Sequence, residues 1–323
     1  MKTNLLGIDI GGTKCAVIFG VDTDSRLSVL DKVSFETADV DSTLRRIMDE
    51  LISMCHRHSL DNSNTLGVGI SCGGPLDSRR GVVLSPPNLP GWDGIPIVGM
   101  VQDATGIPAV LQNDANACAY AEWKYGAGKG SSNMVFLTFG TGLGAGLVLD
   151  GKLYSGTNDN AGELGHVRLS DFGPVGYGKA GSVEGFASGG GIAQLAATAV
   201  KERMMMGGTV PWCPDGNLSG ITAKKVAEAA KAGDPLAIQV YKTSASYLGK
   251  ALSIVIDILN PELIVIGSIF VRAEELIRPF MQAEIDREAL PGTASVCKVV
   301  PAELGDSIGD IAALSLATTI KKV

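Results

Sequence analysis

The sequence lacks the features that mark nucleic-acid-binding, membrane-spanning and disulfide-bonded proteins. Its 323 residues carry a net charge of −7, and its basic residues form only pairs such as Arg45-Arg46, so no basic surface for a phosphate backbone is expected. No apolar run approaches the roughly 18–20 residues that span a bilayer. The six cysteines are scattered without a C-x-x-C pair, which favours a reduced protein over a disulfide framework.

The beginning of the chain adds to these exclusions. Met1 to Leu6 lead directly into the first apolar segment, so we expect neither a signal peptide nor an N-terminal DNA-binding module. Aromatic residues make up only 5% of the chain, but 45% of it is apolar, which is enough for a sizeable core. The length predicts about two domains. We therefore expect a cytoplasmic globular protein without nucleic-acid or membrane partners.

Glycine, by contrast, is abundant, and two glycine-rich turns stand out. The first follows the apolar run Leu5–Ile10 and reads Gly11-Gly12-Thr13-Lys14, and the second follows Leu137–Phe139 and reads Gly140-Thr141-Gly142-Leu143-Gly144. Each pattern predicts a strand that enters a tight hairpin, where glycine lets backbone N–H groups approach an anion closely. Gly11 and Gly140 lie 129 positions apart, so the pair predicts two similar halves that bind one polyphosphate from opposite sides.

Periodicity predicts a duplicated α/β architecture with mixed sheets. Helices are expected over about 41–58, 114–125, 273–288 and 307–321, and Asp234-Pro235 predicts the start of another that ends at Asn260. Strands are expected at 5–10, 15–20, 28–36, 66–71, 108–112, 133–139, 145–149, 262–267 and 295–300. The segment 86–92 is too rich in proline for regular structure, and 156–191 is expected to be irregular.

Two aspartates are candidates for phosphoryl chemistry. Asp9 ends an apolar strand, where an unpaired charge is costly, and a Mg²⁺ ion or its bound water beside phosphates would give it a partner; turn capping is the alternative. Asp114 follows the strand 108–112, where it fits either a helix N-cap or a base that accepts a hydroxyl proton. Thr13 and Lys14 can contact phosphates, although Lys14 fits a solvated hairpin lysine equally well.

These segments, in this order, resemble the ROK family of sugar kinases and repressors, within the actin/hexokinase ATPase superfamily. The matching stretches are 5–14, 67–77, 87–92, 113–128, 137–146, 161–166, 184–188 and 264–267. The resemblance implies a duplicated ribonuclease-H-like fold with a central cleft. It further implies a small lobe of residues 1–118 plus 305–323, a larger lobe of residues 119–304, and a homodimer.

The same resemblance implies an activity and a set of site residues. The expected reaction is ATP- and Mg²⁺-dependent phosphorylation of a hexose, glucose-like or an N-acetylhexosamine, at its 6-hydroxyl, with Asp114 as general base. ATP and phosphate binding are assigned to Asp9 (holding Mg²⁺ through water), Gly11, Gly12, Thr13, Lys14, Gly140, Thr141, Gly142, Gly144 and Gly267. Sugar binding is assigned to Gly74, Asn88, Asn113, Asp114, Glu163, His166 and Glu184. The alternative is a non-catalytic sugar-sensing regulator of the repressor branch that lacks a DNA-binding module.

The chain departs from the family pattern in two places. Most members hold a structural zinc with a histidine and three cysteines of a C-x-C-G-x-x-G-C-L-E segment. Aligned on Glu184, this chain has Val175, Tyr177 and Ser182 at the cysteine positions. One histidine cannot supply the four ligands that zinc takes, so we expect no zinc, with packing in place of the metal. The second departure is Ser268, which stands where most members have a glycine beside the adenosine.

Overall fold

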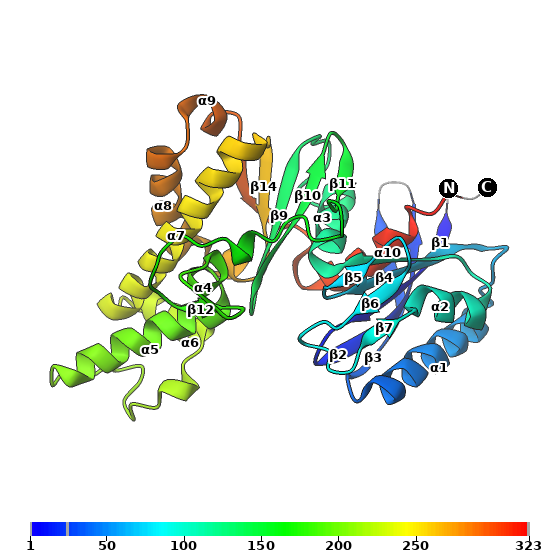
Figure 1. The fold of residues 1–323 in the computed structure, drawn as a ribbon, viewed down its shortest axis with the longest axis horizontal. Coiled ribbons are helices and arrows are strands. Elements are labelled where there is room, and N and C mark those ends of the chain that lie inside the picture. Colours follow the sequence, from blue (N-terminus) through cyan, green and yellow to red (C-terminus); the bar gives the residue numbers. More distant parts are fainter. Residues whose placement is uncertain (1, 24–25, 322–323) are drawn as a thin grey trace. The chain divides into compact units, whose positions relative to one another are not determined.

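The computed structural model describes residues 2–23 and 26–321. The end residues of the expected small lobe, 1, 322 and 323, therefore lie outside the described residues. The chain forms two compact units, labelled by element in Figure 1. Unit 1 comprises Met1–Ser132, Gly146–Ala161 and Glu303–Val323, and unit 2 comprises Asn133–Ala145 and Gly162–Ala302. Both contain helices and mixed-sheet strands, so the predicted α/β class is confirmed.

Unit 1 is built on a five-stranded sheet with the order β3-β2-β1-β4-β8. Its strands are β1 (Thr3–Ile10), β2 (Lys14–Asp22), β3 (Leu27–Glu36), β4 (Thr65–Cys72) and β8 (Ala109–Asn113). The first three are joined by hairpins and pair antiparallel, whereas β4 and β8 extend the sheet in parallel. Because Ile10 pairs with Cys15, the first glycine turn lies at the end of the β1–β2 hairpin, as predicted.

Helices cover both faces of this sheet. The helices α1 (Val40–His58) and α2 (Ile97–Thr105) pack on the face of Leu6, Ile8 and Ile10. On the face of Leu5 lie α3 (Asp114–Tyr125) and α10 (Ile308–Ala317). Helix α10 approaches the strands closely because Gly69 has no side chain: a Cβ there would lie 2.0 Å from the Ala313 carbonyl oxygen. A small sheet of β5 (Leu76–Asp77), β6 (Val82–Leu84) and β7 (Asp93–Ile95) completes the unit.

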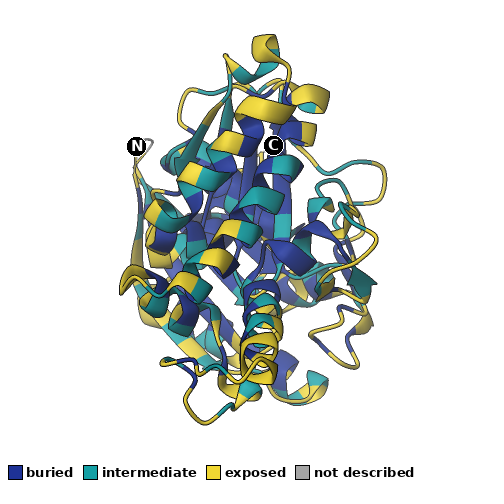
Figure 2. Cartoon of the chain, turned by 90° about the vertical axis from the view of Figure 1, so that its left-hand side faces the viewer, coloured by how far each residue is buried: buried dark blue, intermediate teal, exposed yellow. Residues whose placement is uncertain are grey.

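The second sheet has the order β11-β10-β9-β14-β15. Its strands are β9 (Met134–Phe139), β10 (Leu143–Leu149), β11 (Lys152–Tyr154), β14 (Leu263–Ile266) and β15 (Lys298–Pro301). The long helices of unit 2 are α5 (Gly189–Met205), α6 (Ala223–Lys231), α7 (Pro235–Leu259) and α8 (Ile269–Glu288). Helix α7 begins as predicted, because the Asp234 side chain accepts a hydrogen bond from the Ala237 backbone N–H at 2.9 Å. The exposed residues of the helices face outward, and buried strands lie behind the helices in the view of Figure 2.

Several short elements were not predicted from the sequence. They include α2, the short helices α4 (Val183–Phe186) and α9 (Pro291–Ala294), the hairpin β12 (Val175–Gly176) and β13 (Lys179–Ala180), and the 3₁₀ turns η1 (Leu164–His166), η2 (Leu218–Gly220) and η3 (Gly305–Ser307). The expectation that 156–191 is irregular throughout is therefore wrong. Helix α8 begins four residues before the predicted start, and its kink at Ala273 (φ −136°, ψ 27°) explains why the regular spacing begins only there.

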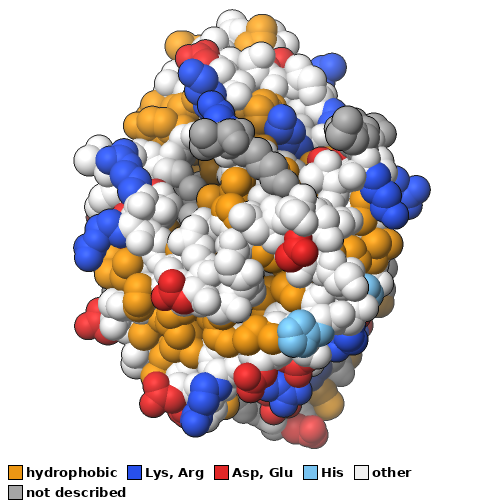
Figure 3. Space-filling model, turned by 90° about the vertical axis from the view of Figure 1, so that its right-hand side faces the viewer, with side chains coloured by type: hydrophobic (Ala, Val, Ile, Leu, Met, Phe, Trp, Pro, Cys, Tyr) orange, Lys and Arg blue, Asp and Glu red, His pale blue; other side chains and the backbone are white. Residues whose placement is uncertain are grey.

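Among the described residues, no helix combines the length and the apolar character needed to cross a membrane. All six cysteines are free thiols. On the face shown in Figure 3, Lys and Arg side chains are dispersed among acidic, apolar and other polar groups.

Candidate functional site

The first glycine turn is held tightly against the loop that carries Asn88. A hydrogen bond of 3.1 Å from the Gly11 N–H to the Lys14 carbonyl closes the turn. A Cβ on Gly12 would lie 2.4 Å from the Asn88 carbonyl oxygen, so no other residue fits without moving that loop. Thr13 and Lys14 are exposed. The turn therefore presents backbone and small polar groups beside the Asn88 side chain.

The two candidate aspartates of unit 1 lie close enough to interact electrostatically. Asp9, at the end of β1, is partly buried, and loss of hydration together with the charges of Asp114 and Asp310 raises its pKa to about 6. Asp114 keeps an exposed surface, but protein atoms crowd its other sides and the resulting desolvation raises its pKa. The first turn of α3 partly offsets this, because the Ala115 N–H donates to the Asp114 carboxylate at 2.8 Å.

The amide side chains expected to bind sugar meet the loop Gly73-Gly74 in the same unit. A Cβ on Gly73 would lie 3.3 Å from the Asn88 Oδ1, and one on Gly74 would lie 3.3 Å from the Asn113 Nδ2. Asn113 is the N-cap of α3, since its Oδ1 accepts hydrogen bonds from the Ala115 and Asn116 N–H groups. Its Oδ1 is thus engaged, which leaves the amide nitrogen as the group that can reach a ligand.

The second glycine turn is fastened to the beginning of α5. The Gly140 carbonyl accepts from the Gly189 N–H at 2.7 Å, and the Thr141 carbonyl accepts from the Gly190 N–H at 3.2 Å. The Thr138 Oγ1 accepts from the Gly144 N–H at 2.9 Å. These hydrogen bonds within unit 2 fix the backbone path of the turn. The Thr141 side chain is exposed.

Glu184, expected at the sugar, also contacts this second glycine turn. Its Oε2 accepts a hydrogen bond from the Leu143 N–H at 3.1 Å. A Cβ on Gly142 would lie only 2.7 Å from the same oxygen, so Gly142 is needed for the contact. Glu163 and His166 are exposed at η1, and a Cβ on Gly165 between them would lie 3.4 Å from the Glu184 Cβ. Within unit 2 the structure therefore brings η1, Glu184 and the second glycine turn together.

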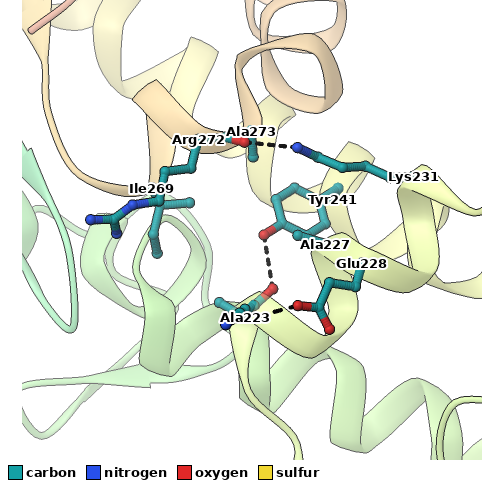
Figure 4. Close-up of a pocket in the computed structure, with 9 residues that line it drawn as sticks. Ala223, Ala227, Glu228, Lys231, Tyr241, Ile269, Arg272 and Ala273 are labelled. Atoms are coloured by element: carbon teal, nitrogen blue, oxygen red, sulfur yellow. Dashed lines mark hydrogen bonds and ion pairs between the residues drawn. The ribbon is translucent and has the colours of Figure 1, made fainter.

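The last predicted nucleotide residue, Gly267, follows β14 and leads into a pocket at the start of α8. The pocket has a volume of about 460 Å³ and is lined by Ala223, Lys224, Ala227, Glu228, Lys231, Tyr241, Ile269, Arg272 and Ala273 (Figure 4). Its walls are braced by hydrogen bonds from the Tyr241 hydroxyl to the Ala223 carbonyl and from the Lys231 ammonium to the Arg272 carbonyl. Ser268, between Gly267 and the pocket, has φ 54° and ψ −108°, a conformation that favours glycine.

Some residues that support the site belong to no sequence motif and were not predicted as site residues. The Thr37 hydroxyl donates to the Gly11 carbonyl at 2.6 Å, and the Thr37 N–H donates to the Thr13 carbonyl at 3.0 Å. Lys32 forms an ion pair with Asp310, with 2.6 Å between its ammonium nitrogen and a carboxylate oxygen. No sequence signal marks these residues, because their role depends on strand register and on a helix about 280 positions away.

The donor set for metal ions is sparse. Within residues 2–23 and 26–321 no group of three or more His, Cys, Asp or Glu side chains is arranged to hold a metal ion. Asp9 has the character of a carboxylate that a cation would stabilise, since burial and two neighbouring carboxylates disfavour its charge. This fits a magnesium ion carried mainly by phosphate oxygens, with Asp9 acting through a bound water.

Comparisons with known proteins agree with the sequence resemblance. A family model described as the ROK family matches residues 5–320. The glucokinase of Halalkalibacterium halodurans is 33% identical over 312 residues, which cover 95% of this chain and 92% of that protein.

Solved structures give the same result. The ROK family glucokinase of Streptomyces griseus, in complex with glucose and AMPPNP, is 30% identical with a TM-score of 0.77, covering 99% of this chain and 100% of that one. A ROK family transcriptional regulator, a homologue of the E. coli MLC protein, is 27% identical with a TM-score of 0.85, covering 98% of this chain and 78% of that one. With its motifs, its fold and a match over nearly its whole length, the chain belongs to the ROK family.

Proposed function

We propose that this protein is an ATP-dependent sugar kinase that phosphorylates a hexose, glucose-like or an N-acetylhexosamine, at its 6-hydroxyl. The observation that carries the proposal is the pair Asp9 and Asp114, two interacting carboxylates in the same unit as the amides of Asn88 and Asn113. The pair gives one carboxylate for the phosphate end of the site and one for the acceptor hydroxyl. The similar glucokinases of H. halodurans and S. griseus support the sugar as acceptor.

Asp114 has the properties of a general base. Phosphoryl transfer needs positioning, charge neutralisation and a group that accepts the hydroxyl proton. Asp114 is fixed at the junction of β8 and α3, and its pKa lies above the ordinary value of 3.8 because it is desolvated. A higher pKa makes the carboxylate a stronger base, which favours transfer of the proton from the 6-hydroxyl.

The glycine turns and the pocket of Figure 4 would bind the nucleotide. The N–H groups of Gly11, Gly140, Leu143 and Gly144 are bonded within the protein, so the remaining N–H groups of the two turns and the exposed hydroxyls of Thr13 and Thr141 would face phosphates. The pocket beyond Gly267 has alanine and isoleucine side chains for a flat ring and charged groups at its margin, and its volume of about 460 Å³ suits a nucleoside. A magnesium ion bound with ATP would neutralise charge on the phosphates, and Asp9 would hold one of its waters.

The sugar-binding groups proposed for unit 1 are Gly74, Asn88, Asn113 and Asp114, and those proposed for unit 2 are Glu163, His166 and Glu184. Carboxylates and amides suit a sugar because each hydroxyl that loses water needs a donor or an acceptor. In unit 2, the hydrogen bond between Glu184 and Leu143 links this set to the second phosphate turn. Binding of sugar at Glu184 would therefore help to order the turn that contacts ATP.

The test of this proposal is the variant Asp114→Asn. We expect the loss of one general base to lower the rate of sugar-dependent ADP release by at least about 100-fold. Sugar binding, measured by calorimetry, should persist because the asparagine keeps a hydrogen-bonding side chain. Asp103→Asn, on the exposed side of α2, is the matched control and should turn over like the unmodified protein. Full turnover by Asp114→Asn would remove Asp114 from the mechanism.

One observation favours a second candidate, a sugar-sensing regulator. The ROK family transcriptional regulator has a TM-score of 0.85 with this chain, which is higher than the 0.77 of the S. griseus glucokinase. A sensor would bind sugar without releasing ADP. The retained Asp9, Asp114 and both glycine turns support the kinase instead, because a sensor does not require a phosphate site or a base.

A further inference from the structure

The segment between His166 and Glu184 connects two of the proposed sugar residues. Most members of the family have zinc-binding cysteines at three positions of this segment. In this chain those positions carry Val175, Tyr177 and Ser182. Ser182 is fully buried, and its Oγ accepts a hydrogen bond from the Gly185 N–H at 3.1 Å as the N-cap of α4. None of the three offers a thiolate, and the Ser182 oxygen is engaged. The residues present therefore do not fit a zinc ion.

A glutamine on α5 fixes the first part of this segment. The Val175 N–H donates to the Gln194 Oε1 at 2.9 Å, and the Gln194 Nε2 donates to the Val175 carbonyl at 2.9 Å. Both backbone groups of one residue are thus bound by a single side chain from a long helix. This two-point contact fixes the position and the direction of β12 relative to α5.

A lysine and a tyrosine of the same hairpin fix His166. The Lys179 ammonium donates to the His166 carbonyl at 2.7 Å. The Tyr177 ring, in the β12–β13 turn, packs edge-on against the His166 ring with 6.1 Å between the ring centroids. Backbone hydrogen bonds from the Val183 N–H to the Val167 carbonyl and from the Leu169 N–H to the Gly181 carbonyl close the segment behind them.

We propose that Gln194, Lys179 and Tyr177 together replace the structural metal, acting as positioning residues that hold His166 and Glu184 for the sugar. This rests on the proposed function, because His166 and Glu184 need fixed positions only if they bind a substrate. The three side chains connect η1, the β12–β13 hairpin and α5, and α4 with Glu184 follows directly after the hairpin. Lys179 also places a positive charge next to His166, which opposes binding of a cation there.

The experiment compares Lys179→Met and Gln194→Ala with the control Lys201→Met, which removes an exposed lysine of α5. Loss of the hydrogen bonds made by Lys179 or Gln194 should raise the KM for sugar about tenfold, with much smaller changes in kcat and in the KM for ATP. Lys179→Arg, which keeps a charged donor, should restore most of the sugar affinity. An unchanged sugar KM in both variants would overturn the proposal.

Two further measurements separate this inference from the proposed function. Elemental analysis of the purified protein should find no stoichiometric zinc, and one zinc ion per chain would contradict the replacement. Hydrogen exchange of residues 166–184 should be faster in Lys179→Met and Gln194→Ala than in Lys201→Met, whether or not the protein turns over. If the unmodified protein releases no ADP with any sugar, the kinase proposal fails, while unchanged exchange in both variants refutes the positioning role.

Discussion

Replacing Asp9 by asparagine should make the unliganded protein more stable at neutral pH and at the same time remove its activity. Asp9 lies at the end of β1, where burial and the charges of Asp114 and Asp310 disfavour its ionised form. Asparagine has nearly the same shape, and its carbonyl oxygen can still accept the hydrogen bond that Ser71 gives to Asp9. The change therefore removes the unfavourable charge with little effect on packing.

The size of the effect follows from the pKa. Its rise from 3.8 to about 6 corresponds to about 3 kcal/mol at neutral pH, an upper figure because the side chain is only partly buried. Between pH 4 and pH 6 the folded protein binds more protons at Asp9 than the unfolded chain does. The free energy of unfolding of the unmodified protein therefore falls at Asp9 as the pH rises through this window. In Asp9→Asn this contribution to the pH dependence is absent.

The assay is urea denaturation of both proteins from pH 4 to pH 8 without nucleotide or Mg²⁺. The stability difference should be small near pH 4 and grow to between about 1 and 3 kcal/mol by pH 7. Asp103→Asn, an exposed aspartate on α2, should show no such pH dependence. Sugar-dependent ADP release by Asp9→Asn should be lost, since the carboxylate is proposed to hold a magnesium-bound water. A pH-independent stability difference, or a less stable variant at pH 7, would refute this account.

Three further variants test other parts of the structure. Ser268→Gly relieves a backbone conformation with φ 54° and should raise the free energy of unfolding by about 1 kcal/mol in chemical denaturation. Glu122→Ala should destabilise the protein by about 3–5 kcal/mol, because this fully buried carboxylate accepts three backbone N–H groups that would lose their partner. Gly12→Ala places a methyl group 2.4 Å from the Asn88 carbonyl oxygen and should lower kcat/KM for ATP by about 10- to 100-fold. Its control is Gly99→Ala, whose methyl group meets no atom within 4 Å and which should leave kcat/KM for ATP unchanged.

The positions of both glycine turns could be predicted from the sequence, because an apolar run followed by several glycines permits few backbone paths. The start of α7 was predictable for a similar reason, since Asp234-Pro235 combines an N-cap with a proline suited to the first helical position. In both cases the information lies within a few neighbouring residues. Elements of only two to nine residues, such as α2 and β12, carry too little periodicity to be recognised.

Contacts between distant segments could not be predicted in this way. Thr37 meets the first glycine turn because β2 and β3 pair with Lys14 opposite Glu36, a register that depends on the whole hairpin. Glu184 reaches Leu143 over 41 positions, and Gln194 reaches Val175 over 19. The missing cysteines predicted the loss of a metal, but the side chains that we propose in its place are visible only in three dimensions.

The central claim, that the protein transfers phosphate from ATP to a hexose, is tested most directly by coupled ADP release over a panel of sugars. The panel should include glucose, mannose, fructose, allose, N-acetylglucosamine and N-acetylmannosamine, with the product identified by mass spectrometry and NMR. We expect Mg²⁺- and sugar-dependent ADP release with at least one hexose, and a product phosphorylated at the 6-hydroxyl. ADP release that is the same with and without every sugar, in a protein that binds sugar by calorimetry, would contradict the claim and favour the regulator.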